Sequence, residues 1–123
     1  MKLFLILGAV NAMLAVMLGA FGAHALEAKL TERNMLNVYQ TGVQYHMYHA
    51  LALVAVGILL GKWPASALLN GAGWSFFVGI LLFSGSLYAL SNTGMKFFGP
   101  ITPLGGVAFI VGWILLIISV VKA

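Results

Sequence analysis

Four long apolar runs, separated by short polar segments, constrain the fold of this chain more than any other feature of its sequence. A helix that crosses the hydrocarbon core of a bilayer needs roughly 20 mainly apolar residues, because each residue adds about 1.5 Å along the axis. The runs predict helices over residues 3–23, 42–61, 68–90 and 104–121. We therefore expect an all-α fold, an integral membrane bundle of four transmembrane helices that forms a single domain over residues 1–123.

The composition excludes several classes of protein. Hydrophobic residues make up 63% of the chain and charged residues 7%, proportions far from those of soluble globular domains. The sequence contains no cysteine, so it has no disulfide framework, thiol nucleophile or thiolate metal site. The formal net charge of +4 rests on basic residues that are scattered singly. We therefore expect the lipid bilayer as a partner and no nucleic acid, which requires clustered basic residues.

Small residues recur at spacings of three and four along the first run, a pattern that favours close helix packing. Lys2 before this run and Ala23-His24-Ala25 after it are also typical of a secretory signal peptide. The regular small-residue face favours a transmembrane helix, in which Asn11 makes an interhelical hydrogen bond. The predicted helix-packing residues, including those of the third and fourth runs, are Gly8, Ala12, Ala15, Gly19, Gly22, Gly85, Ala108 and Gly112.

The segment from Glu27 to Asn37 holds four of the eight Lys, Arg, Asp and Glu residues. Its leucine and methionine residues show partial apolar periodicity, which predicts a short interfacial helix between the first and second transmembrane helices. Both carboxylates of the chain, Glu27 and Glu32, lie here and are explained by a solvated charge cluster. Because the sequence also lacks a phosphate loop and a dinucleotide fingerprint, we expect no enzymatic activity.

The second apolar run is too short to cross a bilayer by itself. Its purely apolar part, from Ala50 to Gly61, contains 12 residues and spans about 18 Å. Counting back roughly 20 residues from Lys62 reaches Gly42, so the histidine- and tyrosine-rich stretch before Ala50 is drawn into the membrane. Ionisable groups at that depth are costly, and they usually face a bundle interior or a wet cavity.

The alternation of helices brings several polar groups to one membrane level, on the side of the first and third loops. Tyr45 and His49 are four residues apart, and His46 and His49 are three apart, so each pair shares a helix face. We expect a one-sided polar pocket for a ligand or a proton, formed by His24, Gln44, Tyr45, His46, His49, Tyr88 and Asn92.

Three interpretations of this polar group remain open. The side chains can pin the helix ends, they can line a wet crevice that binds or passes a small solute or proton, or the histidines can ligate a metal or haem iron. No intramembrane carboxylate joins His46 and His49, and their spacing cannot ligate one haem from opposite faces, so we expect no metal and no cofactor. We take non-enzymatic binding or passage of a small solute or proton as the predicted function. The main alternative is an accessory or structural subunit that packs against a larger membrane complex.

Four sequence blocks carry a resemblance to a known family. They are GAFGAHAL (19–26), VQYHMYHALAL (43–53), FSGSLYALS (83–91) and GPITPLGGVAFIVGWILL (99–116). Together they resemble the small bacterial membrane-protein family known as domain of unknown function 423, whose distant eukaryotic relatives are called transmembrane protein 256. The resemblance implies a four-helix protein of the bacterial cytoplasmic membrane. It implies no established activity, so no catalytic residue is carried over.

The positive-inside count does not decide the orientation, because basic residues are equally divided between the two sides. The side of the termini holds Lys2, Lys62 and Lys122, and the other side holds Lys29, Arg33 and Lys96. The first three lie directly against helix ends, which favours cytoplasmic termini. A 13.1 kDa monomer has little interior in which to enclose a pathway. We therefore expect a homo-oligomer or a partner membrane protein.

Overall fold

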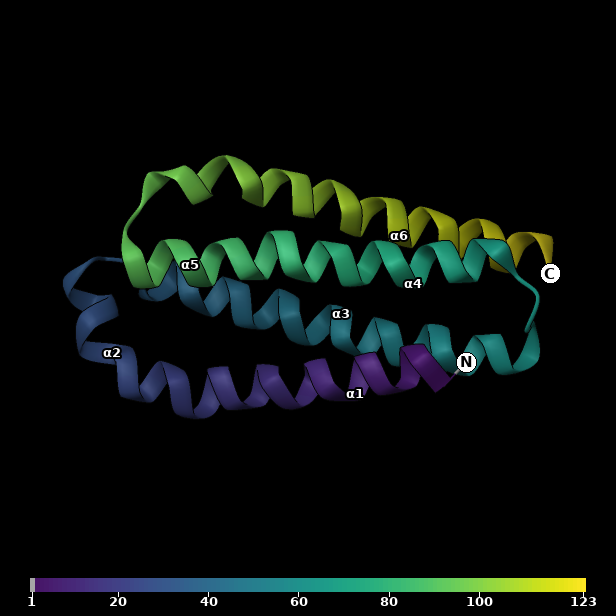
Figure 1. The fold of residues 1–123 in the computed structure, drawn as a ribbon, viewed down its shortest axis with the longest axis horizontal. Helices are drawn as coiled ribbons and strands as arrows, with labels where there is room; N and C mark the ends of the chain where they lie inside the picture. Colours follow the sequence, from purple (N-terminus) through teal and green to yellow (C-terminus); the bar gives the residue numbers. More distant parts are fainter. Residues whose placement is uncertain (1) are drawn as a thin grey trace.

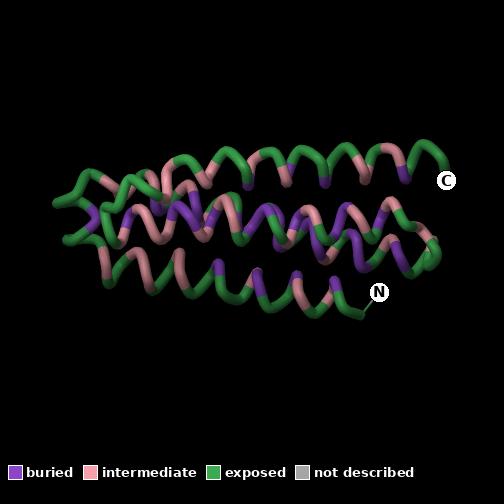
Figure 2. Tube along the Cα trace, turned by 45° about the horizontal axis from the view of Figure 1, so that its top comes forward, coloured by how far each residue is buried: buried purple, intermediate pink, exposed green. Residues whose placement is uncertain are grey.

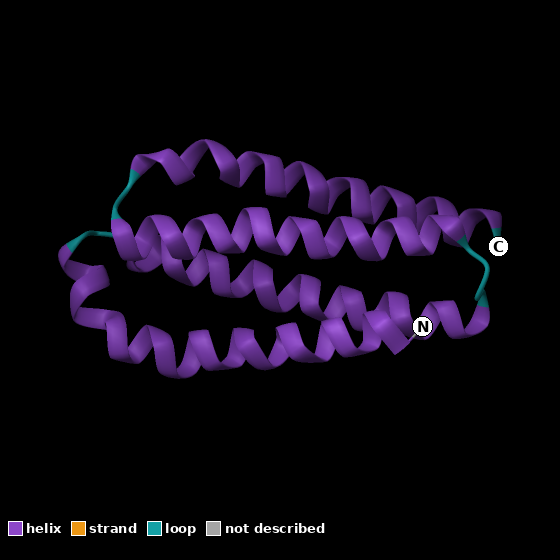
Figure 3. Ribbon diagram, in the orientation of Figure 1, coloured by secondary structure: helices purple, strands orange, loops and turns teal. Residues whose placement is uncertain are grey.

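A computed structural model describes residues 2–123 as four long helices that lie side by side (Figure 1). Every element among these residues is helical (Figure 3). The first long helix comprises α1 (Lys2–Val16), η1 (Met17–Gly22) and α2 (Ala23–Glu32), and the second is α3 (Leu36–Lys62). The third comprises α4 (Ala67–Gly79), η2 (Ile80–Ser84) and α5 (Gly85–Thr93), and the fourth comprises η3 (Lys96–Ile101) and α6 (Thr102–Lys122). All four are long and apolar enough to cross a membrane, which confirms the predicted fold class.

The short interfacial helix expected between the first two spans is not a separate element. α2 continues the first helix without a break to Glu32, and only residues 33–35 connect it to α3. No glycine or proline follows Gly22 in this segment, and alanine, leucine, glutamate and lysine, which dominate it, all favour helix. Each long helix also extends beyond the range expected from hydropathy, because a helical turn is held by backbone hydrogen bonds and does not require apolar residues.

Local sequence signals set the helix ends. Ser66 caps α4, since its hydroxyl oxygen accepts the backbone N–H of Leu69 at 3.1 Å. Gly94 follows α5 with a φ of 70°, a left-handed conformation that glycine adopts without strain. Pro103 lies in the first turn of α6, where its missing N–H costs no intrahelical hydrogen bond. These short connections place the N- and C-terminal ends at the same end of the bundle (Figure 1).

The helices form two antiparallel pairs that pack against each other. α1 lies along α3, α4 lies along α6, and α3 contacts α4, η2 and α5. Figure 2 shows that the two central helices carry most of the buried surface, whereas α1 and α6 are exposed over much of their length. Large apolar side chains such as Ile6, Met13, Ile110 and Ile117 are exposed there. This pattern is typical of helices that contact lipid.

Glycine residues let the helix backbones approach closely. A Cβ atom at Gly8 of α1 would lie 2.8 Å from the Ala50 carbonyl oxygen of α3. One at Gly105 of α6 would lie 2.7 Å from the Phe83 Cα atom of η2. In lipid, apolar burial gives helices little reason to associate, so this close van der Waals packing is a main source of bundle stability.

The other predicted packing residues lie at different depths. Ala15 and Gly112 are buried, and a Cβ atom at Gly112 would lie 2.6 Å from the Phe76 ring. Gly85 is the least constrained, because a Cβ atom there would meet its nearest neighbour only at 3.9 Å. The remaining members are half-buried, and they are Ala12, Gly19, Gly22 and Ala108.

The interior has an apolar half and a polar half. Near the chain ends the buried Ser119 donates to a carbonyl oxygen of its own helix, and the rest of the core consists of aliphatic and aromatic side chains. These are Phe4, Ala52, Leu53, Val56, Leu60, Leu69, Ala72, Phe76, Ile80 and Phe109. Toward the other end the buried side chains include polar groups, which are Asn11, His46, His49, Ser84, Ser86 and Ser91. Every buried side-chain nitrogen and oxygen in residues 2–123 has a hydrogen-bond partner. The polar half therefore satisfies its own hydrogen-bonding groups, as a membrane interior requires.

Candidate functional site

His46 is the centre of a hydrogen-bonded unit that joins three of the long helices. Its Nε2 atom lies 2.9 Å from Oδ1 of Asn11 on α1, and its Nδ1 atom lies 2.9 Å from the Tyr88 hydroxyl on α5. The Asn11 amide nitrogen donates to the Leu7 carbonyl oxygen at 2.8 Å, so Oδ1 faces the imidazole and accepts. The network therefore assigns the His46 proton to Nε2, and the Tyr88 hydroxyl donates to Nδ1.

His49 forms a second unit, directed toward α6. Its Nδ1 atom lies 2.8 Å from the Tyr45 carbonyl oxygen, which can only accept, so Nδ1 carries the proton. Its Nε2 atom accepts the indole N–H of Trp113 at 3.0 Å. The ring also stacks on Phe109, with centroids 3.5 Å apart and 8° between the planes. Tyr45 contributes its carbonyl oxygen and also its ring, which lies nearly parallel to the imidazole with centroids 6.2 Å apart and 16° between the planes.

His46 and His49 are both 4% exposed, but they face different neighbours. His46 forms hydrogen bonds with α1 and α5, whereas His49 forms a hydrogen bond with α6 and packs its ring near Phe76 of α4. Together the two imidazoles connect α3 to each of the other long helices. Hydrogen bonds between membrane helices are modest individually, but three such bonds to three neighbouring helices fix the rotation of α3 about its axis.

Two π-helical segments, η1 and η2, lie beside the first half of α3. The Tyr39 hydroxyl donates to the Leu18 carbonyl oxygen of η1 at 2.7 Å. The Ser84 hydroxyl of η2 donates to the Gly42 carbonyl oxygen at 2.7 Å. A π segment inserts one residue into a helical turn, which shifts the side chains that follow and often occurs at functional sites. Here both segments occur where polar side chains of one helix contact the backbone of another.

Three of the predicted pocket residues lie apart from the histidine units. His24 and Gln44 are exposed. The Asn92 side-chain nitrogen donates to the Tyr88 carbonyl oxygen at 2.9 Å, and the Asn92 carbonyl oxygen accepts from the Arg33 guanidinium. Arg33 thus ties the first loop to the C-terminal end of α5, where the helix dipole favours a cation. Asn92 therefore belongs to a helix cap.

His24 and Gln44 line a groove between the first long helix and the start of α3. Two hollows of about 260 Å³ and 320 Å³ meet there, because Gly19, Ala23 and Gln40 line both of them. We call this region the interfacial groove. Its polar side chains are His24, Glu27, Gln40 and Gln44, so it offers an imidazole, a carboxylate and two amides.

The histidine units do not favour the haem or metal interpretation. Each ring nitrogen of His46 and His49 already has a hydrogen-bond partner. In the part of the chain that the structure describes, no three His, Cys, Asp or Glu side chains are placed to hold a metal ion.

Trp113, Tyr39 and Gln40 were not among the predicted site residues. Trp113 carries a polar N–H in the middle of an apolar helix, and such a donor needs a partner where no water is present. Tyr39 and Gln40 precede the hydropathy-defined start of the second helix, so the length argument excluded them. Continuing the helical spacing backward from Gln44 places Gln40 on the same face.

Known proteins are similar to this chain over most of its length. The profile of the family described as "Protein of unknown function (DUF423)" matches residues 18–106. The UPF0382 membrane protein YwdK of Bacillus subtilis (strain 168) is 57% identical over 122 residues, which are 99% of this chain and 98% of the relative. This chain belongs to the DUF423 family. The UPF0382 membrane protein SAB0533 of Staphylococcus aureus (strain bovine RF122 / ET3-1) is 53% identical with the same coverage. No solved structure matches.

Family membership confirms the resemblance and the membrane class that the sequence indicated. This member of the DUF423 family is a bacterial membrane protein with four candidate spans. The family profile includes His24, His46 and Tyr88, whereas Asn11 and Trp113 lie outside the matched range of residues 18–106. The names of these two relatives state no activity.

Proposed function

We propose that this DUF423 family member is a non-enzymatic membrane protein that binds a small polar solute at the interfacial groove. The observation that supports this function is the groove, in which polar side chains from two helices line the two joined hollows. His24 and Glu27 are three residues apart on α2, and Gln40 and Gln44 are four apart on α3. Each pair therefore projects to one side of its helix.

The position and charge of the groove suit a solute that enters from the water. Gln44 lies about 27 Å along the helix axis from Lys62, and the hydrocarbon core is roughly 30 Å thick. A solute thus reaches the groove from the headgroup region without crossing the hydrocarbon. The Glu27 carboxylate and the amide oxygens favour a solute with a cationic hydrogen-bond donor.

The histidine units support binding better than passage through one chain. The hydrogen bonds that run from Tyr88 through His46 and Asn11 end at the Leu7 carbonyl oxygen. Beyond that point lies the apolar core, which gives a proton or solute no hydrogen-bonding groups. In this proposal the units hold α3 in the rotation that forms the groove.

The test compares two glutamate variants, Glu27→Gln in the groove and Glu32→Gln outside it. The protein in nanodiscs is titrated with ethanolamine, glycine, urea and acetate, which represent a cation, a zwitterion, a neutral solute and an anion. Binding is followed by the NMR shifts of the Gln40 and Gln44 side-chain amides. We expect saturable shifts with ethanolamine, and about fivefold weaker binding for Glu27→Gln, which corresponds to one exposed ion pair.

Glu32→Gln is the matched control, because Glu32 also lies on α2 but does not line the groove. We expect this variant to bind ethanolamine as the unaltered protein does. Absence of saturable shifts with all four solutes, or equal weakening by both variants, contradicts the proposal.

A second candidate function is that of an accessory or structural subunit. It is favoured by the complete hydrogen bonding of the buried polar groups in residues 2–123, which suits a rigid bundle that presents a fixed surface. A photo-crosslinking residue in place of Val10 or Ile117, both exposed, tests this in the living membrane. If the protein is a subunit of a larger complex, the residue crosslinks to one discrete partner protein. If it is a solute-binding monomer, the residue crosslinks to lipid alone.

The proposed function also includes a location in the cell and an assembly state. We place the protein in the bacterial cytoplasmic membrane, with both termini in the cytoplasm. Self-association remains part of the proposal, but Gly8 and Ala15 lend it no support, since both are buried between helices of one chain. In the crosslinking test, a homo-oligomer gives an adduct of twice the mass of the chain.

A further inference from the structure

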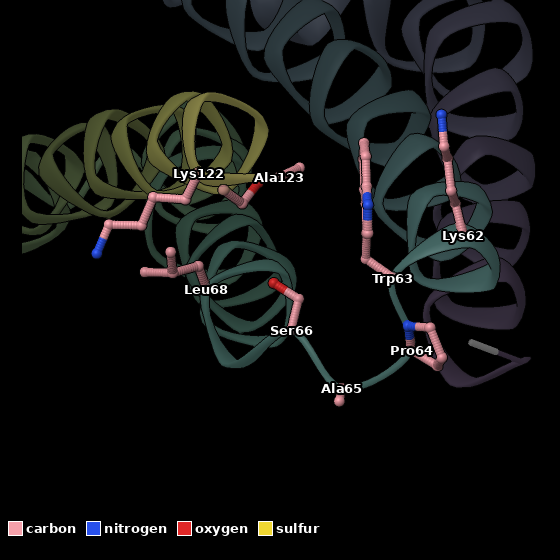
Figure 4. Close-up of a pocket in the computed structure, with 9 residues that line it drawn as sticks. Lys62, Trp63, Pro64, Ala65, Ser66, Leu68, Lys122 and Ala123 are labelled. Atoms are coloured by element: carbon pink, nitrogen blue, oxygen red, sulfur yellow. The ribbon is translucent and has the colours of Figure 1, made fainter.

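A hollow of about 400 Å³ lies at the opposite end of the bundle from the interfacial groove (Figure 4). It is formed by the connection between α3 and α4 together with the end of α6. We call it the basal hollow. Its lining residues are Lys62, Trp63, Pro64, Ala65, Ser66, Leu68, Ser119, Lys122 and Ala123.

Two lysines flank the basal hollow. Figure 4 shows Lys62 and Lys122 on opposite flanks, with Trp63 and Ser66 between them. In this view the Lys62 ammonium lies beyond the Trp63 ring, and the Lys122 ammonium points away from Ser66. Both lysine side chains are exposed, so their flexible stems allow each ammonium group to turn toward the opening when an anion binds. The Lys62 ammonium lies 5.0 Å from the centroid of the Trp63 ring, within the range of a cation–π contact, and Trp63 itself lines the hollow.

Between the lysines the hollow offers one hydroxyl group and apolar walls. The Ser66 oxygen accepts the Leu69 N–H with a lone pair, and this bond does not use the hydroxyl hydrogen. Ser119 is different, because its hydroxyl donates to the Leu116 carbonyl oxygen at 2.7 Å. Pro64, Ala65 and Leu68 provide the apolar contacts.

The helix ends place the basal hollow at the level of the lipid headgroups. Lys62 ends α3, Ser66 precedes α4 and Lys122 ends α6. Tryptophan and lysine residues at such ends mark the membrane interface. At this level the most concentrated anions are lipid phosphates, and basic pockets between membrane helices bind such headgroups.

We propose that the basal hollow binds the headgroup of an anionic phospholipid. The phosphate lies between the ammonium groups of Lys62 and Lys122, and the Ser66 hydroxyl donates to it. The apolar walls contact the first acyl carbons, which glycerol phosphate and inorganic phosphate lack. This site is independent of the interfacial groove and of any solute bound there.

The experiment measures lipid retention by native mass spectrometry. The full chain is released from nanodiscs that contain equal amounts of phosphatidylglycerol and phosphatidylcholine. We expect one retained phosphatidylglycerol, preferred about tenfold over phosphatidylcholine, because each lysine near the surface attracts an anionic lipid. The double variant Lys62→Gln/Lys122→Gln should reduce that preference to less than about threefold.

Lys2→Gln is the matched control, since Lys2 lies at the same end of the bundle but does not line the basal hollow. We expect it to keep the preference. Glycerol phosphate and inorganic phosphate, added in solution, should not displace the lipid. Equal retention of both lipids, an equal loss in Lys2→Gln, or displacement by either soluble phosphate overturns the proposal.

Discussion

Each buried imidazole in this bundle has its proton on a different ring nitrogen. His46 donates from Nε2 and His49 donates from Nδ1, because Asn11 Oδ1 and the Tyr45 carbonyl oxygen can only accept. The partner atoms, rather than the spacing of the two histidines, decide this. Trp113 can only donate, so a second proton on His49 has no acceptor in the present arrangement. At the scale of single residues, both histidines therefore act as hydrogen-bonded connections between helices.

Replacing Asn11 with alanine removes the acceptor for the His46 Nε2 proton. We expect the free energy of unfolding to fall by about 0.5–2 kcal/mol, the range of hydrogen bonds between membrane helices and of an unpaired buried donor. Nitrogen NMR of the imidazoles should show a changed signal for His46 and an unchanged Nδ1-protonated tautomer for His49. Reversible unfolding in mixed micelles gives the free energy.

Asn70→Ala provides the control, because the Asn70 amide bonds only to the Ser66 carbonyl oxygen at an exposed position. Its effect should stay within about 0.5 kcal/mol, as for other surface substitutions. A His46 signal that shows the proton on Nδ1 in the unaltered protein contradicts the assigned network.

At the scale of whole helices, the contacts with η2 set how closely the last two spans pack. Gly105 of α6 lies against the backbone of Phe83, so the helices meet with no side chain between them at that point. The Ser86 and Thr102 hydroxyl oxygens, 2.6 Å apart, join the same two helices. A π segment on one side of a contact and a glycine on the other together determine the helix separation.

Adjacent glycines on α6 give a sharp test of this packing. We expect Gly105→Ala to lower the free energy of unfolding by about 1–3 kcal/mol, because the added methyl group meets backbone atoms that cannot move aside easily. The methyl group added by Gly106→Ala would have its nearest neighbour, an atom of the Phe83 ring, at 3.9 Å. It should be neutral or stabilising by up to about 1 kcal/mol, the helix-propensity difference. Equal losses in the two variants would show that the helices do not meet at Gly105.

Across the whole molecule, polar groups are distributed unevenly along the membrane normal. One half of the interior is apolar apart from Ser119, and the other contains the histidine units next to the interfacial groove. The basal hollow lies outside the apolar half, at the headgroup level. The two candidate binding regions therefore open toward opposite membrane surfaces, so the orientation of the protein decides which surface each one faces.

Reporter fusions test that orientation. We expect a fluorescent protein fused before residue 2 or after Ala123 to fold and fluoresce, because both ends lie at the same end of the bundle and we propose that they are cytoplasmic. Alkaline phosphatase inserted after Asn34 or Gly94 should be active, since both loops lie at the other end. Fluorescence from one terminus alone contradicts the even number of spans. Loss of fluorescence at both termini together with inactive phosphatase in both loops contradicts cytoplasmic termini.

Some properties of this protein follow from its sequence by local reasoning. Four spans, the absence of a cysteine site and the polar stretch inside the second helix all depend on the length and hydropathy of short segments. The sequence blocks alone also identified the family. Hydropathy placed the helix ends less well, because Ala23–Glu32 and Leu36–Thr41 form helix without being apolar throughout. Such turns are stable on propensity and hydrogen bonds alone.

Only the tertiary structure decided which side chains meet. The predicted single pocket is divided into the histidine units, the interfacial groove and the cap at Asn92. The physical reason is that the rotation of each helix about its axis decides which side chain of a neighbouring helix a given residue meets. That rotation is set by distant features, the π segments η1 and η2 and the close contacts at Gly8 and Gly105. Spacing within one helix specifies a face, but not the neighbour that the face meets.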